Sequence, residues 1–279
     1  MIFRQIRNIA TAIYSLYADS GFAMAGAVAF SFVLSLFPFC IFLGAVAGLF
    51  GGEAFAKQGI ERLFEIAPAP VAEALAPEVM AVMGRSRFDL LTFGALISLF
   101  FATSAIESLR AALNVAYRQK EKRPYFLCLM ESSLFVILSA LGMLVLTWGV
   151  VVGPEMVARF KPEPLRWLAD AGWLALIVRF AIVIAAIGLV LVAYHLWLAA
   201  GRRRLSDVWP GVVLSVVLWV FAARLFGSWL TVTDYSRFYA GLTQIMSALV
   251  FFQVSAIIVI LGAELNRGLL EIKERRAAA

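Results

Sequence analysis

Long apolar runs without a charged residue constrain this chain more than any other feature of its sequence. Residues 20–52 contain no Asp, Glu, Lys or Arg, and the same is true of residues 90–106, 132–154, 180–201 and 238–263. A helix that crosses the ~30 Å hydrocarbon core of a bilayer needs about 20 apolar residues. These runs therefore predict transmembrane helices.

The composition excludes several other classes of protein. The 279 residues are 63% hydrophobic and 15% charged, and the mean hydropathy is +0.91. Soluble domains are about 45–50% apolar and about 25% charged. The difference excludes a soluble globular enzyme, a disordered regulator and a fibrous repeat. The net charge of +6 favours contact with membrane lipids, and we expect no nucleic-acid partner.

The apolar runs predict an all-α polytopic membrane protein that forms a single membrane domain over residues 1–279. Apolar residues at helical spacing in residues 1–20 predict an amphipathic helix at the membrane interface. Six spans are expected, at residues 22–50, 89–106, 127–152, 173–200, 209–233 and 238–263. Three segments outside them are expected to be short amphipathic helices in a first outer loop, a separate basic helix and a cytoplasmic tail, at residues 53–89, 107–126 and 264–279.

The distribution of basic residues predicts that both termini are cytoplasmic. With the N-terminus inside, the inner segments carry 14 Lys and Arg residues and the outer segments carry 8. Arg202, Arg203 and Arg204 in one short loop are the strongest single indication. Basic loops stay preferentially on the cytoplasmic side of a membrane, so we expect a multi-pass protein with both ends in the cytoplasm.

Several motifs along the chain resemble the YihY/BrkB family. They are residues 29–38, Ile106-Glu107-Ser108-Leu109-Arg110 with Leu113-Asn114, the loop 201–205, Trp209-Pro210-Gly211, Tyr239-Ala240-Gly241-Leu242 and Leu261-Gly262-Ala263-Glu264-Leu265-Asn266. The resemblance implies a six-span protein of the bacterial inner membrane. Members of that family were once labelled ribonuclease BN and are now mostly treated as transporters, with export of lipids or envelope precursors as the expected role.

Two arginines lie deep within the predicted spans, where a charge costs about 2.5–3.5 kcal/mol to insert. Arg179 lies nine residues inward from Asp170, and Arg224 lies ten residues inward from Asp234, ~13–15 Å from the outer ends of their helices. Arginine suits bidentate binding of phosphate or carboxylate, so the pair predicts a site for an anionic solute or lipid. Alternatively, Arg179 extends to the outer interface, and Arg224 pairs with backbone carbonyls or Asp234.

Uncharged polar residues in the spans are further candidates for a substrate path. Ser31 and Ser35 lie one turn apart, and Pro38 frees a backbone carbonyl and could act as a hinge. The two hydroxyls could equally bond back to their own helix. Gln253, near the centre of the last span, is the best candidate further along the chain.

Three glutamates lie at the inner ends of spans two, three and six, namely Glu107, Glu131 and Glu264. They could form an inner gate that responds to protons or cations. The alternative interpretation is salt bridging to nearby basic residues, namely Arg110, Arg123, Arg267 and the loop at Arg202.

Together these features predict a transporter or flippase for an anionic solute, lipid or envelope precursor. No GxxxxGK[ST] motif is present, so the chain itself is not expected to hydrolyse ATP. We expect no enzyme, metal or cofactor, because metal-dependent RNA cleavage needs clustered ligands and the single histidine, His195, favours a packed, hydrogen-bonded role. The alternative is a non-catalytic scaffold for envelope machinery, which would tolerate substitution of the deep arginines.

Overall fold

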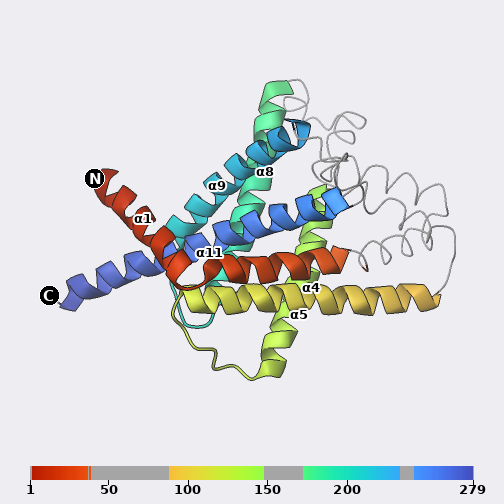
Figure 1. Cartoon of the computed structure of the whole chain (residues 1–279), viewed down its shortest axis with the longest axis horizontal. Helices are drawn as coiled ribbons and strands as arrows, with labels where there is room; N and C mark the ends of the chain where they lie inside the picture. The colour runs from red at the N-terminus through yellow and green to blue at the C-terminus, as the bar shows by residue number, and fades with distance from the viewer. Residues whose placement is uncertain (1, 37, 39–87, 148–171, 233–241, 279) are drawn as a thin grey trace, which may run out of the picture.

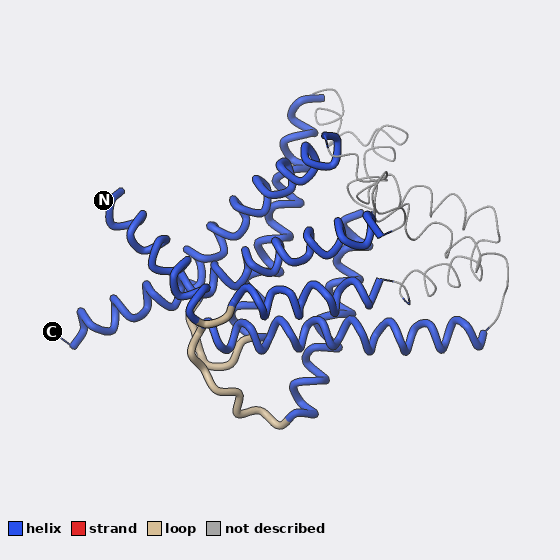
Figure 2. Tube along the Cα trace, viewed as in Figure 1, coloured by secondary structure: helices blue, strands red, loops and turns tan. Residues whose placement is uncertain are grey.

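The computed structural model of the protein describes residues 2–36, 38, 88–147, 172–232 and 242–278. All regular secondary structure in these residues is helical (Figure 2). Five of the described helices are long and apolar enough to cross a membrane, and a bent pair near the N-terminus raises the number to six at most. The structure therefore confirms the predicted all-α, polytopic membrane fold.

Short loops connect consecutive helices at one end of the molecule. Their bounds are α1 Ile2–Ala18, the N-terminal span Gly21–Leu36, α4 Phe88–Ala116, α5 Tyr125–Thr147, α8 Gly172–Ala193, the single π-helical turn η3 Tyr194–Leu198, α9 Leu205–Val232 and α11 Leu242–Ala278. The π-turn η3 directly continues α8.

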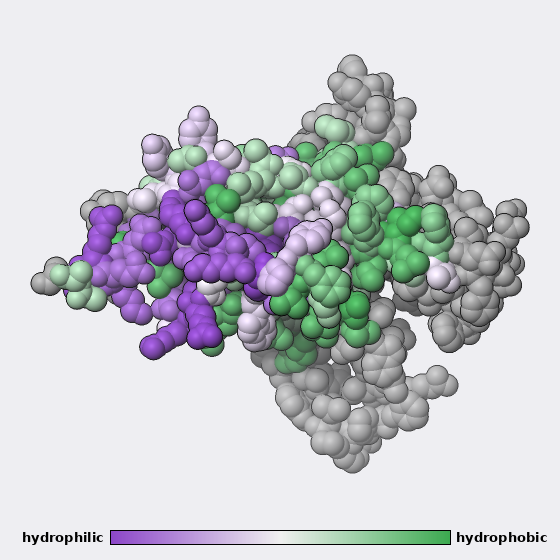
Figure 3. Space-filling model, turned by 90° about the horizontal axis from the view of Figure 1, so that it is seen from below, coloured by the Kyte–Doolittle hydropathy of each residue, from purple (hydrophilic) through white to green (hydrophobic). Residues whose placement is uncertain are grey.

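The described helices converge at the end of the molecule where both termini lie (Figure 1). We call this the polar end; it comprises the loops 117–124 and 199–204 and the bend at residues 19–20. From there α8 and α9 run toward the top of the view, whereas the N-terminal span, α4 and α11 run to the right. Hydrophilic side chains gather at the polar end and hydrophobic ones along the helices (Figure 3).

The N-terminal helix is amphipathic and meets the first span at a sharp bend. α1 buries Ala12 and Leu16 and exposes Tyr14 and Tyr17. The two helices meet at 70°, and Ser20 between them has φ 58°, a left-handed conformation that commonly ends a helix. The bend separates α1 from the N-terminal span, as expected for an amphipathic helix that precedes the first span.

Two helices run past the ends of their predicted spans. α4 continues ten residues beyond residue 106 to Ala116, and residues 117–124 form a loop. The basic helix expected over 107–126 is therefore confirmed for residues 107–116, as the end of α4, and wrong for residues 117–124. α11 continues through the expected tail, 264–279, as far as Ala278. The charges that marked these ends, Glu107 and Glu264, pair with arginines of the protein, so the helices need not end there. Residues 53–87 of the expected first outer loop lie outside the described residues.

The tightest helix crossing joins α9 to α11. A Cβ atom on Gly211 would collide with the carbonyl oxygen of Gly262, and one on Gly262 would collide with Oγ of Ser215. Small residues of this kind let membrane helices approach backbone to backbone. The Ser215 hydroxyl donates a hydrogen bond to the carbonyl of Ile258 at 3.1 Å. Both glycines are therefore required by the crossing.

Replacing Gly211 or Gly262 with alanine should destabilise this crossing. The added methyl group has no room, and overpacking costs roughly 1–3 kcal/mol. Gly227, also in α9, has open space where its Cβ would lie, so Gly227→Ala should leave stability unchanged or raise it by up to about 1 kcal/mol. Thermal unfolding in detergent measures all three variants. A wild-type midpoint for Gly262→Ala would contradict the packing described here.

Candidate functional site

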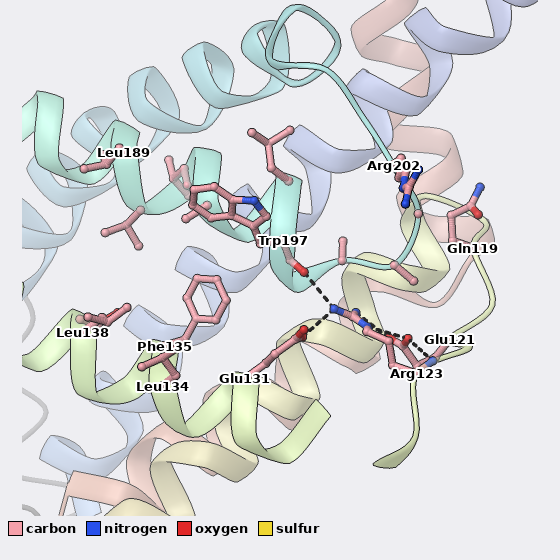
Figure 4. Close-up of a pocket in the computed structure, with 18 of the residues that line it drawn as sticks. Gln119, Glu121, Arg123, Glu131, Leu134, Phe135, Leu138, Leu189, Trp197 and Arg202 are labelled. Carbon is pink, nitrogen blue, oxygen red and sulfur yellow. Dashed lines mark hydrogen bonds and ion pairs between the residues drawn. The ribbon is translucent and has the colours of Figure 1, made fainter. Parts of the chain in front are cut away.

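A groove of about 1320 Å³ lies between α5 and α8 (Figure 4). Its walls are mainly apolar, with Leu134 and Leu138 from α5, Leu189 from α8 and Trp197 from η3. These four side chains are 55%, 56%, 69% and 65% exposed, respectively. The groove is therefore open along its side, through a rim of apolar side chains on the surface of the helices.

The groove ends at the polar end in a charged mouth. Its charged lining residues are Lys120, Glu121, Lys122, Arg123, Glu131 and Arg202. Four of these are basic and two are acidic, so the mouth has a net charge of +2 (4 − 2). Lys120, Lys122 and Arg202 are exposed, and none of the ion pairs within the described residues includes them.

Arg123 fastens the loop 117–124 to the end of α8. Its Nη1 donates to Glu131 Oε2 at 2.6 Å and to the carbonyl of Trp197 at 3.1 Å, and its Nη2 donates to Glu121 Oε2 and the carbonyl of Leu198. Figure 4 shows the contacts of Arg123 with Glu131, Trp197 and Glu121 across the mouth. The hydrogen bond from Arg123 lowers the pKa of the Glu121 carboxyl to about 2, so Glu121 stays ionised at physiological pH.

A second arginine, Arg203, donates hydrogen bonds to carbonyls at the end of η3. The turn is followed by Ala199 in an extended conformation, which leaves the last carbonyls of the helix without helical partners. Arg203 donates from Nε to the carbonyl of His195 at 3.0 Å and from Nη2 to the carbonyls of Ala199 and Ala200 at 2.8 Å. Its guanidinium also lies 3.9 Å from the centroid of the Tyr117 ring, a cation–π contact.

A buried chain of hydrogen bonds links η3 to α9 and α11. Asn266 Nδ2 donates to Tyr117 Oη at 3.1 Å and to the carbonyl of Val208 at 3.0 Å, and its Oδ1 accepts from the Gly211 N–H at 2.7 Å. Because Asn266 supplies a donor, we assign the Tyr117 hydroxyl as donor to His195 Nδ1 at 2.9 Å. This arrangement agrees with the packed, hydrogen-bonded role expected for the single histidine.

The glutamates of the predicted gate fall into two separate groups. Arg110, which is 2% exposed, contacts Glu107 at 3.3 Å and Glu131 at 3.4 Å. Glu264 instead pairs with Arg118 at 3.2 Å, and Arg118 also binds Asp19 at 2.8 Å. These ion pairs match the salt-bridging alternative for Glu107 and Glu131. Glu264 is salt-bridged too, but to Arg118, which was not among the expected partners, whereas Arg267 pairs with Glu271 and Glu274.

The other predicted site residues lie away from the groove, apart from Arg179, whose side chain is outside the described residues. Arg224 is exposed on α9, and Gln253 is half-buried on α11. Neither lines the groove, so their roles in binding stay predictions. Within the described part of the chain, no three His, Cys, Asp or Glu side chains form a group that could hold a metal ion.

The serines and the proline of the N-terminal span also lie outside the groove lining. Ser35 is buried and donates to the carbonyl of Phe32 at 2.7 Å, which matches the alternative in which the hydroxyl bonds to its own helix. Ser31 is half-buried. Pro38 is helical, but both of its neighbours lie outside the described residues, so its role as a hinge stays a prediction.

The groove and its mouth were not predicted from the sequence. Of the predicted site residues, Glu131 is the one that lines it. The available signal was that the two loops, 117–124 and 199–204, are both basic and were placed on the same side of the membrane. The contact between the loops depends on how α8 ends. The same is true of the hydrogen bonds that Arg123 and Arg203 donate to the carbonyls at that helix end.

Replacing Tyr117 with phenylalanine should destabilise the protein by about 1–3 kcal/mol. The change leaves His195 Nδ1 and one Asn266 Nδ2 hydrogen without their partner in a buried site. Tyr125→Phe is the matched control, because Tyr125 is 75% exposed and should change stability little. Thermal unfolding in detergent distinguishes them, and equal midpoints for the two variants would refute the buried network.

Glu107→Gln and Glu131→Gln should be non-additive, because both carboxylates contact Arg110. Their combined effect on the free energy of unfolding should differ from the sum by more than about 0.5 kcal/mol. Glu131→Gln and Glu264→Gln share no partner among the described residues and should add within about 0.5 kcal/mol. Coupling between Glu131 and Glu264 would instead restore the three-residue gate.

Comparison with known proteins agrees with the motifs in the sequence. The family model described as virulence factor BrkB matches residues 12–279. The chain is 27% identical over 260 residues to the ribonuclease-like protein YfkH of Bacillus subtilis (strain 168), covering 91% of this chain and 92% of that relative. No solved structure gives a significant match. With its membrane-spanning helices and a match over nearly its whole length, the chain belongs to the BrkB family of multi-pass membrane proteins.

Proposed function

We propose that this BrkB-family protein is a transporter or flippase that moves an anionic amphiphile along the groove between α5 and α8. One observation carries the proposal: the same groove has an apolar, sideways-open wall and a basic mouth. An amphiphile presents the same two chemistries, an apolar chain and a charged head. A soluble anion would need the basic mouth alone.

The size of the groove supports a large ligand. Pockets for drug-sized ligands are about 300–1,000 Å³, whereas this groove has a volume of about 1320 Å³. Because its apolar rim is exposed, a ligand could enter from the bilayer without first passing through water. A lipid or a lipid-linked envelope precursor fits this route.

We infer that the polar end faces the cytoplasm of a bacterium and that the mouth opens at the inner leaflet of its inner membrane. The basic loops at this end follow the bias that keeps Lys and Arg on the cytoplasmic side. Exposed aromatic side chains flank these loops, as in the aromatic belts of membrane proteins; they are Tyr17, Tyr125, Trp197 and Trp209.

Arg224, which lies outside the groove lining, is proposed as a second anion-binding position. It is exposed on α9, and no ion pair with it occurs among the described residues. Its place inside an apolar helix is costly, which favours a functional reason for keeping it.

We further propose that the chain is no enzyme, since its histidine is fully buried in the hydrogen-bonded network with Tyr117.

Transport can be tested with the full chain in vesicles that contain a fluorescent phosphatidylglycerol, by measuring how fast the lipid crosses between leaflets. Wild-type protein should accelerate the exchange, and Gly142→Phe, which places a ring in the groove, should abolish most of it. Both Gly142 and Gly26 have open space at Cβ, but Gly26 does not line the groove.

Gly26→Phe is therefore the control and should retain the wild-type rate. Arg224→Gln should lower the rate of lipid exchange, although the variant should fold normally. No acceleration by wild-type protein, with the lipid and with lipid-linked precursors alike, would refute transport and leave the scaffold interpretation.

A further inference from the structure

We infer that the groove holds one glycerophospholipid of the adjoining leaflet, with an acyl chain between α5 and α8 and its phosphate at Lys120, Lys122 and Arg202. This inference rests on the proposed function, because it names the substrate class and the residues that bind its head. It predicts a preference for an anionic head group, such as phosphatidylglycerol, over the zwitterionic phosphatidylethanolamine.

The length of the groove matches one leaflet. On α5 the lining runs from Glu131 at the mouth to Gly142, and on α8 and η3 it runs from Trp197 to Ala186, so the two ends of each wall are eleven residues apart. At 1.5 Å per residue both walls are ~16 Å long along their helix axes, a length close to half of the ~30 Å hydrocarbon core. An acyl chain of a lipid in that leaflet extends over the same length, so the head group would lie at the mouth.

The mouth offers cations to a phosphate rather than to protein carboxylates. The two acidic residues there, Glu121 and Glu131, are both bound by Arg123. Lys120, Lys122 and Arg202 are exposed and enter no ion pair within the described residues. Phosphate oxygens accept strong charge-assisted hydrogen bonds from such groups. The remaining charge therefore complements an anionic head group.

The two loops that carry these cations are held against each other. Gly201 has φ +95°, and the space where its Cβ would lie is bordered by the Gln119 side chain at 3.3 Å. Arg202 follows this glycine and lies beside Gln119 in Figure 4. Arg123, already bound to two carboxylates and two carbonyls, is a positioning residue that keeps the loops together. The phosphate site is thus built before a lipid arrives.

The test uses full-length protein in vesicles with trace phosphatidylglycerol or phosphatidylethanolamine that carries a photoreactive group in the acyl chain. After illumination, the labelled residues are mapped by mass spectrometry. The phosphatidylglycerol probe should label α5 and α8 along the groove more than the phosphatidylethanolamine probe does. Lys122→Gln with Arg202→Gln should lower this labelling roughly tenfold, since each basic residue near a membrane surface contributes several-fold to anionic-lipid affinity.

Arg275→Gln with Arg276→Gln removes the same charge from exposed positions at the end of α11 and should leave the labelling unchanged. Gly142→Phe should lower the labelling without altering the mouth, which guards against misfolding of the mouth variant. Equal labelling by the two probes, labelling spread over helix faces outside the groove, or full displacement by soluble glycerol phosphate would overturn the inference. Groove labelling without lipid exchange would refute transport alone, and lipid exchange without groove labelling would refute this site alone.

Discussion

The end of the π-turn η3 imposes the hydrogen-bonding requirement on which the polar end depends. Backbone carbonyls at a helix end must find donors, and near a bilayer water supplies few of them. Two arginines from different loops, Arg123 and Arg203, donate to five carbonyls over residues 195–200. Arg123 thereby joins the loop 117–124 to η3, and Arg203 of the loop 199–204 also lies over the Tyr117 ring, so ending one helix also organises the surface beside it.

Charge compensation explains why long helices continue through charged positions. Arg110 is almost fully buried, yet it contacts Glu107 and Glu131 and donates to the Ser132 hydroxyl at 2.9 Å. Removing one partner of such a cluster leaves a buried charge unpaired, which costs more than the cluster contributes. Glu264, in the middle of α11, meets the same requirement through Arg118.

The groove follows from these two constraints. Arg123 donates to both carboxylates of the mouth, and among the described residues no carboxylate pairs with Lys120, Lys122 or Arg202. The apolar walls of α5 and α8 need no polar partners, since they face a lipid environment. An amphipathic site therefore arises where a fixed polar end meets helices whose side chains suit the bilayer.

The sequence by itself determined the class of the protein: charge-free runs are long enough for a bilayer and too apolar for water, and the family motifs stand in order along the chain. It also indicated which loops are basic. Only the tertiary structure decided which residues meet. Gly211, from one motif, and Gly262 and Asn266, from another, form one contact between α9 and α11. The three glutamates of the expected gate lie in two groups, because Glu131 and Glu264 are beside different arginines. The groove depends on how α8 ends. Neither could be predicted, since helical spacing within one segment carries no information about its neighbours.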